Sequence, residues 1–93
     1  MTREEIQRKI MPVLRSYGIQ RAGLFGSAAS GTMRADSDID ILVDIRKDIS
    51  LLEFVEIKQK LEERLGRRVD LVEYQTIKPA LRDTILRNQF VLL

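Results

Sequence analysis

The most informative part of this 93-residue sequence is the stretch Ser37-Asp38-Ile39-Asp40-Ile41-Leu42-Val43-Asp44-Ile45. Carboxylate and aliphatic side chains alternate at its start, and this period of two predicts a β-strand over residues 38–45. Successive side chains leave opposite faces of a strand, so Asp38 and Asp40 are expected on one face, with Ile39 and Ile41 on the other, in the core. The stretch therefore predicts a strand that carries two carboxylates on one face.

Upstream of this strand, the sequence predicts a helix, another strand and a turn. A capping box at residues 2–5 predicts the start of a helix over residues 3–17. The apolar run at residues 19–25 predicts a first strand, which leads into a segment rich in glycine, serine and alanine at residues 26–32. The middle of that segment can form one helical turn.

Downstream, a second capping box begins at Ser50 and predicts an amphipathic helix that ends at Gly66. Its apolar positions are expected to face the core: Leu51, Phe54, Ile57, Leu61 and Leu65. A third strand is predicted over residues 68–72, and Thr76 is expected to cap a last helix over residues 77–88. The inward positions of that helix are Leu81, Ile85 and Leu86.

The C-terminal segment Phe90-Val91-Leu92-Leu93 fits a fourth edge strand, a packed tail or an exposed apolar patch. With the helices and strands above, it completes a single domain over residues 1–93. The expected fold class is α/β, with a small mixed sheet of three to four strands flanked by helices.

Composition limits the chemistry of this domain. The sequence has no cysteine, which excludes disulfides, thiol catalysis and cysteine-bound zinc. It also has no histidine, which excludes a Ser-His-Asp triad and histidine metal sites. Any catalysis must therefore use carboxylates, lysine, arginine, hydroxyls or backbone groups.

Sixteen basic and fourteen acidic residues are interleaved and give a net charge of +2, which favours neither a nucleic-acid partner nor a membrane surface. No apolar stretch is long enough for a transmembrane helix or a signal peptide, so a cytoplasmic location is expected. Small domains often gain stability from a partner, which leaves homo-oligomers and hetero-oligomers open.

Two carboxylates on one strand face form a hard-oxygen site suited to Mg²⁺ or Mn²⁺, especially where a phosphate supplies further ligands. Asp70 offers a third carboxylate from the strand over residues 68–72. Gly26 and Ser27 lie just upstream, where free amides and a hydroxyl can hold phosphate oxygens. Each residue alone fits a surface charge or an ordinary turn, but together they predict a phosphate cradle beside a metal site.

Two other phosphate or metal motifs fail. Gly26-x-x-x-x-Gly31 has P-loop spacing, but the next two positions lack the required lysine and Ser/Thr. Asp36-x-Asp38-x-Asp40 resembles the start of an EF-hand loop, but glycine is missing at its sixth position and glutamate at its twelfth.

The combined pattern resembles the signature of the DNA polymerase β-like nucleotidyltransferase superfamily: Gly26-Ser27, Gly31 and Ser37-Asp38-Ile39-Asp40. The short length and the segment Arg68-Val69-Asp70-Leu71-Val72 make the chain similar to the minimal nucleotidyltransferase (MNT) family, whose genes often pair with a HEPN-domain ribonuclease toxin. The resemblance implies the polymerase β-like nucleotidyltransferase fold. It departs at Ser30, where many relatives carry an arginine for which Arg34 is a candidate substitute.

The resemblance implies that Asp38 and Asp40 share two Mg²⁺ ions, with Mn²⁺ as an alternative. Asp70 would be the third carboxylate, either a metal ligand or the acceptor of a proton from the attacking hydroxyl. Gly26 and Ser27 would contact the triphosphate of ATP.

The function implied is transfer of AMP from ATP to a hydroxyl, in the favoured case a tyrosine, of a partner HEPN toxin. The protein would then be the antitoxin of a type VII-like toxin–antitoxin pair. Two alternatives stay open: an antitoxin that neutralises its toxin by docking alone, and a nucleotidyltransferase that acts on a small molecule or RNA.

Overall fold

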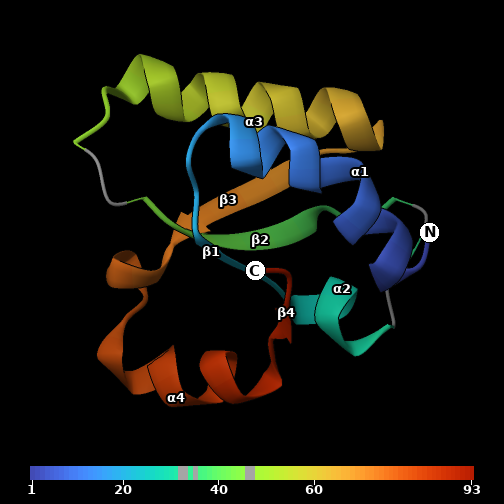
Figure 1. The fold of residues 1–93 in the computed structure, drawn as a ribbon. Helices are drawn as coiled ribbons and strands as arrows, with labels where there is room; N and C mark the ends of the chain where they lie inside the picture. The colour runs from blue at the N-terminus through green and yellow to red at the C-terminus, as the bar shows by residue number, and fades with distance from the viewer. Residues whose placement is uncertain (32–33, 35, 46–47) are drawn as a thin grey trace.

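The computed structural model describes residues 1–31, 34, 36–45 and 48–93. Thr32, the last residue of the predicted glycine-rich segment, lies outside this set. The elements alternate along the chain (Figure 1): α1 (Arg3–Ser16), β1 (Arg21–Phe25), α2 (Gly26–Ser30), β2 (Ile39–Asp44), α3 (Leu51–Leu65), β3 (Val69–Glu73), the 3₁₀ turn η1 (Tyr74–Thr76), α4 (Pro79–Asn88) and β4 (Phe90–Val91). None of these helices is long and apolar enough to cross a membrane.

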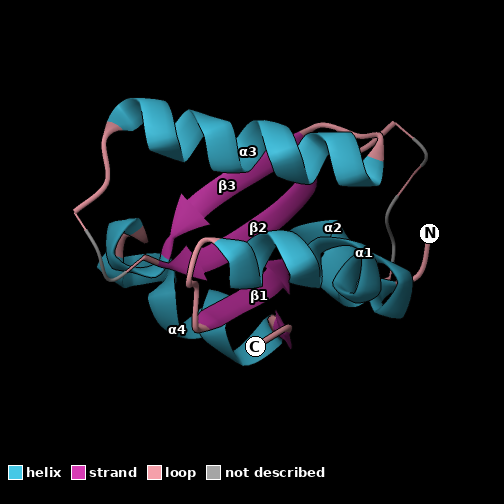
Figure 2. Ribbon diagram, turned by 45° about the horizontal axis from the view of Figure 1, so that its top comes forward, coloured by secondary structure: helices cyan, strands magenta, loops and turns pink. Residues whose placement is uncertain are grey.

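The four strands form one mixed sheet in the order β3-β2-β1-β4. β1 is antiparallel to both β2 and β4, whereas β2 and β3 are parallel and are joined through α3. Figure 2 shows β3, β2 and β1 side by side, with α3 running along the sheet. The predicted mixed sheet of three to four strands is confirmed.

Both capping boxes form as predicted. The Thr2 hydroxyl accepts a hydrogen bond from the Glu5 amide at 3.1 Å, and the Ser50 hydroxyl accepts one from the Glu53 amide at 3.1 Å. Gly66 ends α3 in the left-handed conformation, with φ of 66°. These local signals fix α1 and α3 close to their predicted bounds.

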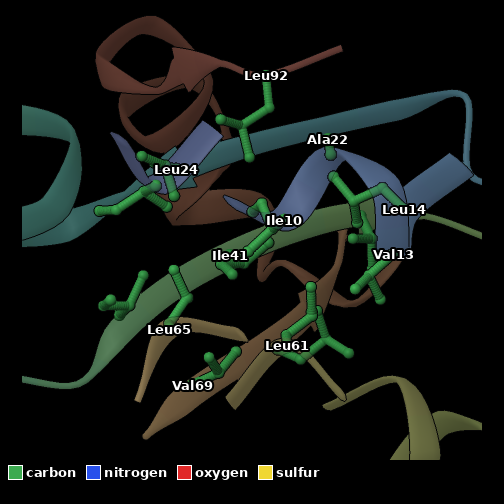
Figure 3. Packing of buried hydrophobic residues seen from close by; sticks show 14 of the residues in the cluster. Ile10, Val13, Leu14, Ala22, Leu24, Ile41, Leu61, Leu65, Val69 and Leu92 are labelled. Carbon is green, nitrogen blue, oxygen red and sulfur yellow. The ribbon is translucent and has the colours of Figure 1, made fainter. Parts of the chain in front are cut away.

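The main core lies between the sheet and the pair α1 and α3 (Figure 3). Ile10 and Leu14 of α1, Ile41 of β2, and Leu61 of α3 are all fully buried in it. Leu92, just after β4, is also buried, whereas Val91 is 60% exposed. The C-terminal segment is therefore a short edge strand with a packed tail.

The opposite face of the sheet is covered by α4 and η1 (Figure 1). Its smaller core consists of Leu42, Tyr74 and Ile77, with four half-buried side chains around them: Phe25, Val72, Ile85 and Leu86. No residue of α4 is buried, so this layer is thin. The candidate site lies on this thinly covered face.

The predicted start of the last helix is wrong. The helix begins at Pro79, and Lys78 before it is extended with ψ of 135°, because a residue that precedes proline disfavours the helical region. Thr76 does not cap the helix, since its hydroxyl donates to the Glu73 carbonyl at 2.9 Å. It belongs to η1 instead.

Two leucines predicted to face inward are exposed. Leu51 is 78% exposed because it lies at the rim of an open hollow lined also by Phe54 and Leu71. Leu81 is 53% exposed, since α4 contacts the sheet side through Ile85 and Leu86. Helical spacing predicted an apolar stripe on each of these two helices, but the rest of the chain covers only part of each stripe.

Candidate active site

The residues of the predicted phosphate cradle lie where β1 turns directly into α2. Gly26 opens α2 with φ of +64°, a left-handed conformation that favours glycine. A Cβ atom at this position would lie 2.4 Å from Oδ2 of Asp40. Gly26 is therefore needed for the turn and for the close approach of a carboxylate, and Ser27 follows it half-buried.

Asp40 and Asp70 are direct neighbours in the sheet. The parallel register of β2 and β3 pairs them, and the antiparallel register of β1 and β2 places Phe25 on the other side of Asp40. Paired residues project from the same face, so Phe25, Asp40 and Asp70 form one row across three strands. Asp40 is half-buried in this row, and Asp70 is exposed.

Asp38 immediately precedes β2 and is exposed. Burial, followed by the negative charges of Asp70 and Asp38, raises the pKa of Asp40 from 3.8 to about 6. The surroundings of Asp40 therefore disfavour its ionised form unless a cation is present.

The Asp40 and Asp70 end of this row is accessible to solvent, whereas Phe25 packs against the smaller core. The next position of β2 on the same face, Leu42, is fully buried beneath Tyr74 and Ile77. The η1 and α4 layer therefore covers one end of the face, while the end with Asp40 and Asp70 is available to a substrate.

The donor set fits a divalent cation. Hard carboxylate oxygens and the negative charges of Asp70 and Asp38 around Asp40 favour a bound cation. Within the described residues, no three acidic side chains are arranged to hold a metal ion by themselves. Phosphate oxygens and water commonly complete such a coordination shell, so Asp38, Asp40 and Asp70 remain predicted ligands.

Ser37, the serine of the predicted Ser-Asp-x-Asp signature, has a structural contact. Its hydroxyl accepts a hydrogen bond from the Arg34 amide at 3.2 Å, and its own amide donates to the Arg34 carbonyl at 3.1 Å. These two bonds close the chain just before Asp38. Arg34 is exposed, and its predicted role in place of the arginine missing at residue 30 stays a prediction.

One residue near the site had no signal in the sequence. Arg67 is half-buried, and its guanidinium contacts the backbone carbonyls of Arg34 and Ser37, 33 and 30 residues away in the chain. No spacing rule connects an arginine after a helix with a loop so distant. Only the folded structure brings Arg67 next to these two carbonyls.

The chain is similar to known proteins. A family model described as "Polymerase beta, Nucleotidyltransferase" matches residues 8–93. A candidate protein adenylyltransferase of Methanocaldococcus jannaschii is 48% identical over 88 residues, which cover 95% of each chain.

Solved structures agree in fold. A toxin–antitoxin complex with AMP-PNP matches with a TM-score of 0.80 and 31% identity, over 94% of this chain and 72% of the other. The tri-AMPylated Shewanella oneidensis HEPN toxin in complex with MNT antitoxin matches with a TM-score of 0.75 and 26% identity, over 99% and 72%. Since the family match spans almost the entire described sheet and its acidic row, this chain belongs to the polymerase beta nucleotidyltransferase family.

Proposed function

We propose that this chain is a Mg²⁺-dependent protein adenylyltransferase that modifies a hydroxyl, in the favoured case a tyrosine, of a partner HEPN toxin. It would be the antitoxin of a type VII-like toxin–antitoxin pair in the cytoplasm, with residues 1–93 as one nucleotidyltransferase domain. The observation that carries the proposal is the pairing of Asp40 with Asp70 beside Gly26, on the open end of the sheet. The relatives named as an adenylyltransferase and as an antitoxin bound to an AMPylated toxin support it.

Each site residue has a distinct role in this proposal. Gly26 and Ser27 position the triphosphate of ATP, with the amides of α2 and the Ser27 hydroxyl as donors. Asp38 and Asp40 hold the metal, which we propose to be two Mg²⁺ ions, with Mn²⁺ as an alternative. When bound, the metal neutralises phosphate charge and helps to align the attacking and leaving oxygens.

The reaction exchanges one phosphorus–oxygen bond for another. The acceptor hydroxyl oxygen forms a bond with the α-phosphorus of ATP, and the bond from that phosphorus to the bridging oxygen breaks, which releases pyrophosphate. The hydroxyl proton leaves to a base. Asp70 is exposed at the end of the acidic row, where it can orient the acceptor and accept this proton.

The surroundings of the row favour a protein acceptor. The smaller core under α4 includes Leu42 and the Phe25 end of the row, whereas Asp40 is half-buried and Asp70 is exposed. A macromolecule that docks on this face would exclude water and complete the site. A small-molecule acceptor would lack that enclosure.

Neutralisation by docking alone is suggested by the apolar C-terminal segment, but that segment offers little exposed surface. The apolar C-terminal segment is largely packed, with Leu92 buried and Phe90 half-buried against the main core. Val91 is left as its exposed residue. The acidic row has no role in a purely docking antitoxin.

The deciding experiment is intact-mass analysis of the HEPN protein encoded beside this gene, after incubation with this chain, ATP and Mg²⁺. A mass gain of one or more AMP units is expected. Asp38→Asn and Asp40→Asn should each abolish it, whereas Asp48→Asn, at an exposed position after β2, should leave it unchanged. A stable complex without any mass gain would contradict the proposal.

A further inference from the structure

We propose that Arg67 is a positioning residue that fixes the backbone in front of Asp38 and so sets the geometry of this predicted metal ligand. This inference rests on the proposed role of Asp38. Arg67 lies between Gly66, which ends α3, and β3, and its side chain is half-buried. It reaches across to the chain segment that leads into β2.

One nitrogen of Arg67 joins two carbonyls. Its Nη2 donates to the Arg34 carbonyl at 2.6 Å and also to the Ser37 carbonyl. A charged donor strengthens such hydrogen bonds, and the rigid planar guanidinium holds both acceptors in one relative position. The Ser37 carbonyl belongs to the peptide group that joins Ser37 to Asp38, so its orientation is coupled to the Asp38 backbone.

The same segment is closed internally. Arg34 and Ser37 already share two hydrogen bonds, from the Ser37 amide to the Arg34 carbonyl and from the Arg34 amide to the Ser37 hydroxyl. The Arg34 carbonyl therefore accepts from both Ser37 and Arg67. The Arg67 guanidinium thus adds hydrogen bonds to a segment that is already bonded internally, and it links that segment to the start of β3.

The backbone on the other side of Asp38 is held as well. The Ile39 amide donates to the Arg68 carbonyl at 2.9 Å, directly before β2 and β3 begin to pair. Asp38 is thus flanked by bonds to two consecutive residues, Arg67 and Arg68. Because the Asp38 side chain is exposed, packing does little to fix its position, and these backbone bonds must do so.

Removal of the guanidinium should therefore loosen Asp38 without disturbing the core. In Arg67→Ala, we expect amide hydrogen exchange in the peptide over residues 34–39 to accelerate. We also expect Mn²⁺ binding in the presence of a non-hydrolysable ATP analogue, followed by electron paramagnetic resonance, to weaken by about 10- to 100-fold, as outer contacts to metal ligands commonly cause. Neither measurement requires the toxin.

Three variants make the test specific. Arg67→Lys keeps one charged donor and should fall between the wild type and Arg67→Ala, which also covers the case in which Arg67→Ala does not fold. Arg8→Ala removes an exposed guanidinium from α1, on the opposite face of the sheet from the acidic row, so it should match the wild type. Asp38→Asn combined with Arg67→Ala should bind Mn²⁺ no more weakly than Asp38→Asn alone.

The inference is overturned if Arg67→Ala and Arg67→Lys exchange and bind Mn²⁺ like the wild type. It is equally overturned if wild-type Mn²⁺ binding does not depend on Asp38. If both readouts change as expected but no AMP reaches the toxin, the positioning role stands and the proposed acceptor is wrong.

Discussion

A Cβ atom added to Gly26 would lie 2.4 Å from Oδ2 of Asp40, well inside the contact distance of the two atoms. Gly26 comes from the end of β1 and Asp40 from the start of β2, and the antiparallel register sets them side by side. The turn that presents the predicted phosphate site thus depends on the same contact as the predicted metal ligand. A side chain at residue 26 would therefore displace the Asp40 carboxylate.

Gly26→Ala should abolish AMP transfer. The Asp40 carboxylate would have to turn away from the added methyl group, and the left-handed backbone would add a cost of about 1–2 kcal/mol to the free energy of folding. Gly18→Ala is the matched control, because Gly18 has φ of +70° with nothing within 4 Å of an added Cβ. It should lose similar stability in urea unfolding and keep its activity; equal activity in both variants would refute the role of the contact.

Asp40 should make the metal-free protein less stable as pH rises. Its pKa is about 6 in the folded protein, above the ordinary value of 3.8, so the folded state holds the proton more tightly. Its contribution to stability is complete below pH 3.8 and is lost as pH rises through about 6. Asp40→Asn lacks this titration, so the Tm of the wild type in EDTA, relative to that of Asp40→Asn, should fall between pH 4 and pH 7.

Added Mg²⁺ should reverse that trend. A cation prefers the ionised carboxylate, so the Tm gain from Mg²⁺ and ATP should be larger at pH 7.5 than at pH 5. Asp48→Asn should behave as the wild type does. A Tm difference between the wild type and Asp40→Asn that is constant with pH would show that the Asp40 pKa is not raised.

Asp70→Asn separates the two roles left open for this carboxylate. If Asp70 accepts the acceptor proton, kcat should fall by about 10²- to 10⁴-fold while Mn²⁺ and ATP-analogue binding stay close to wild type. If Asp70 is chiefly a metal ligand, binding should weaken along with kcat. Electron paramagnetic resonance of Mn²⁺ and single-turnover AMP transfer, measured on one preparation, distinguish these outcomes.

The sequence predicted the elements that depend on local signals. Thr2 and Ser50 cap their helices through bonds to residues three positions away, so the pattern and the contact lie in one window. Lys78 shows the limit of such signals, since the proline after it shifted the start of α4.

The sequence predicted which residues belong to the candidate site, but not how the fold brings them together. Alternation placed Asp40 on a strand face, yet its register with Asp70 depends on how α3 returns the chain to the sheet. Exposure of Leu51 depends on what packs against it, which no helical period encodes. Arg67 had no signal at all, because both of its partners lie about a third of the chain away.

The stability of the thin core beneath α4 should depend on the buried hydroxyl of Tyr74. Tyr74 is 3% exposed, and its hydroxyl donates to Oε1 of Gln89 at 2.8 Å, with the Arg21 guanidinium 4.2 Å from its ring centre. Tyr74→Phe removes this hydroxyl, so the half-buried Gln89 oxygen loses its hydrogen bond from Tyr74. The free energy of unfolding should therefore fall by about 1–2 kcal/mol.

Tyr17→Phe provides the matched comparison, because the Tyr17 hydroxyl also donates at 2.8 Å, to Glu56, but at an exposed position. Water can replace that partner, so the loss should stay below about 0.5 kcal/mol in the same urea titration. AMP transfer should survive both substitutions, since neither tyrosine lies in the row of Asp40 and Asp70. Equal stability losses would mean that burial does not strengthen the Tyr74 bond, and α4 would then be held by its apolar contacts alone.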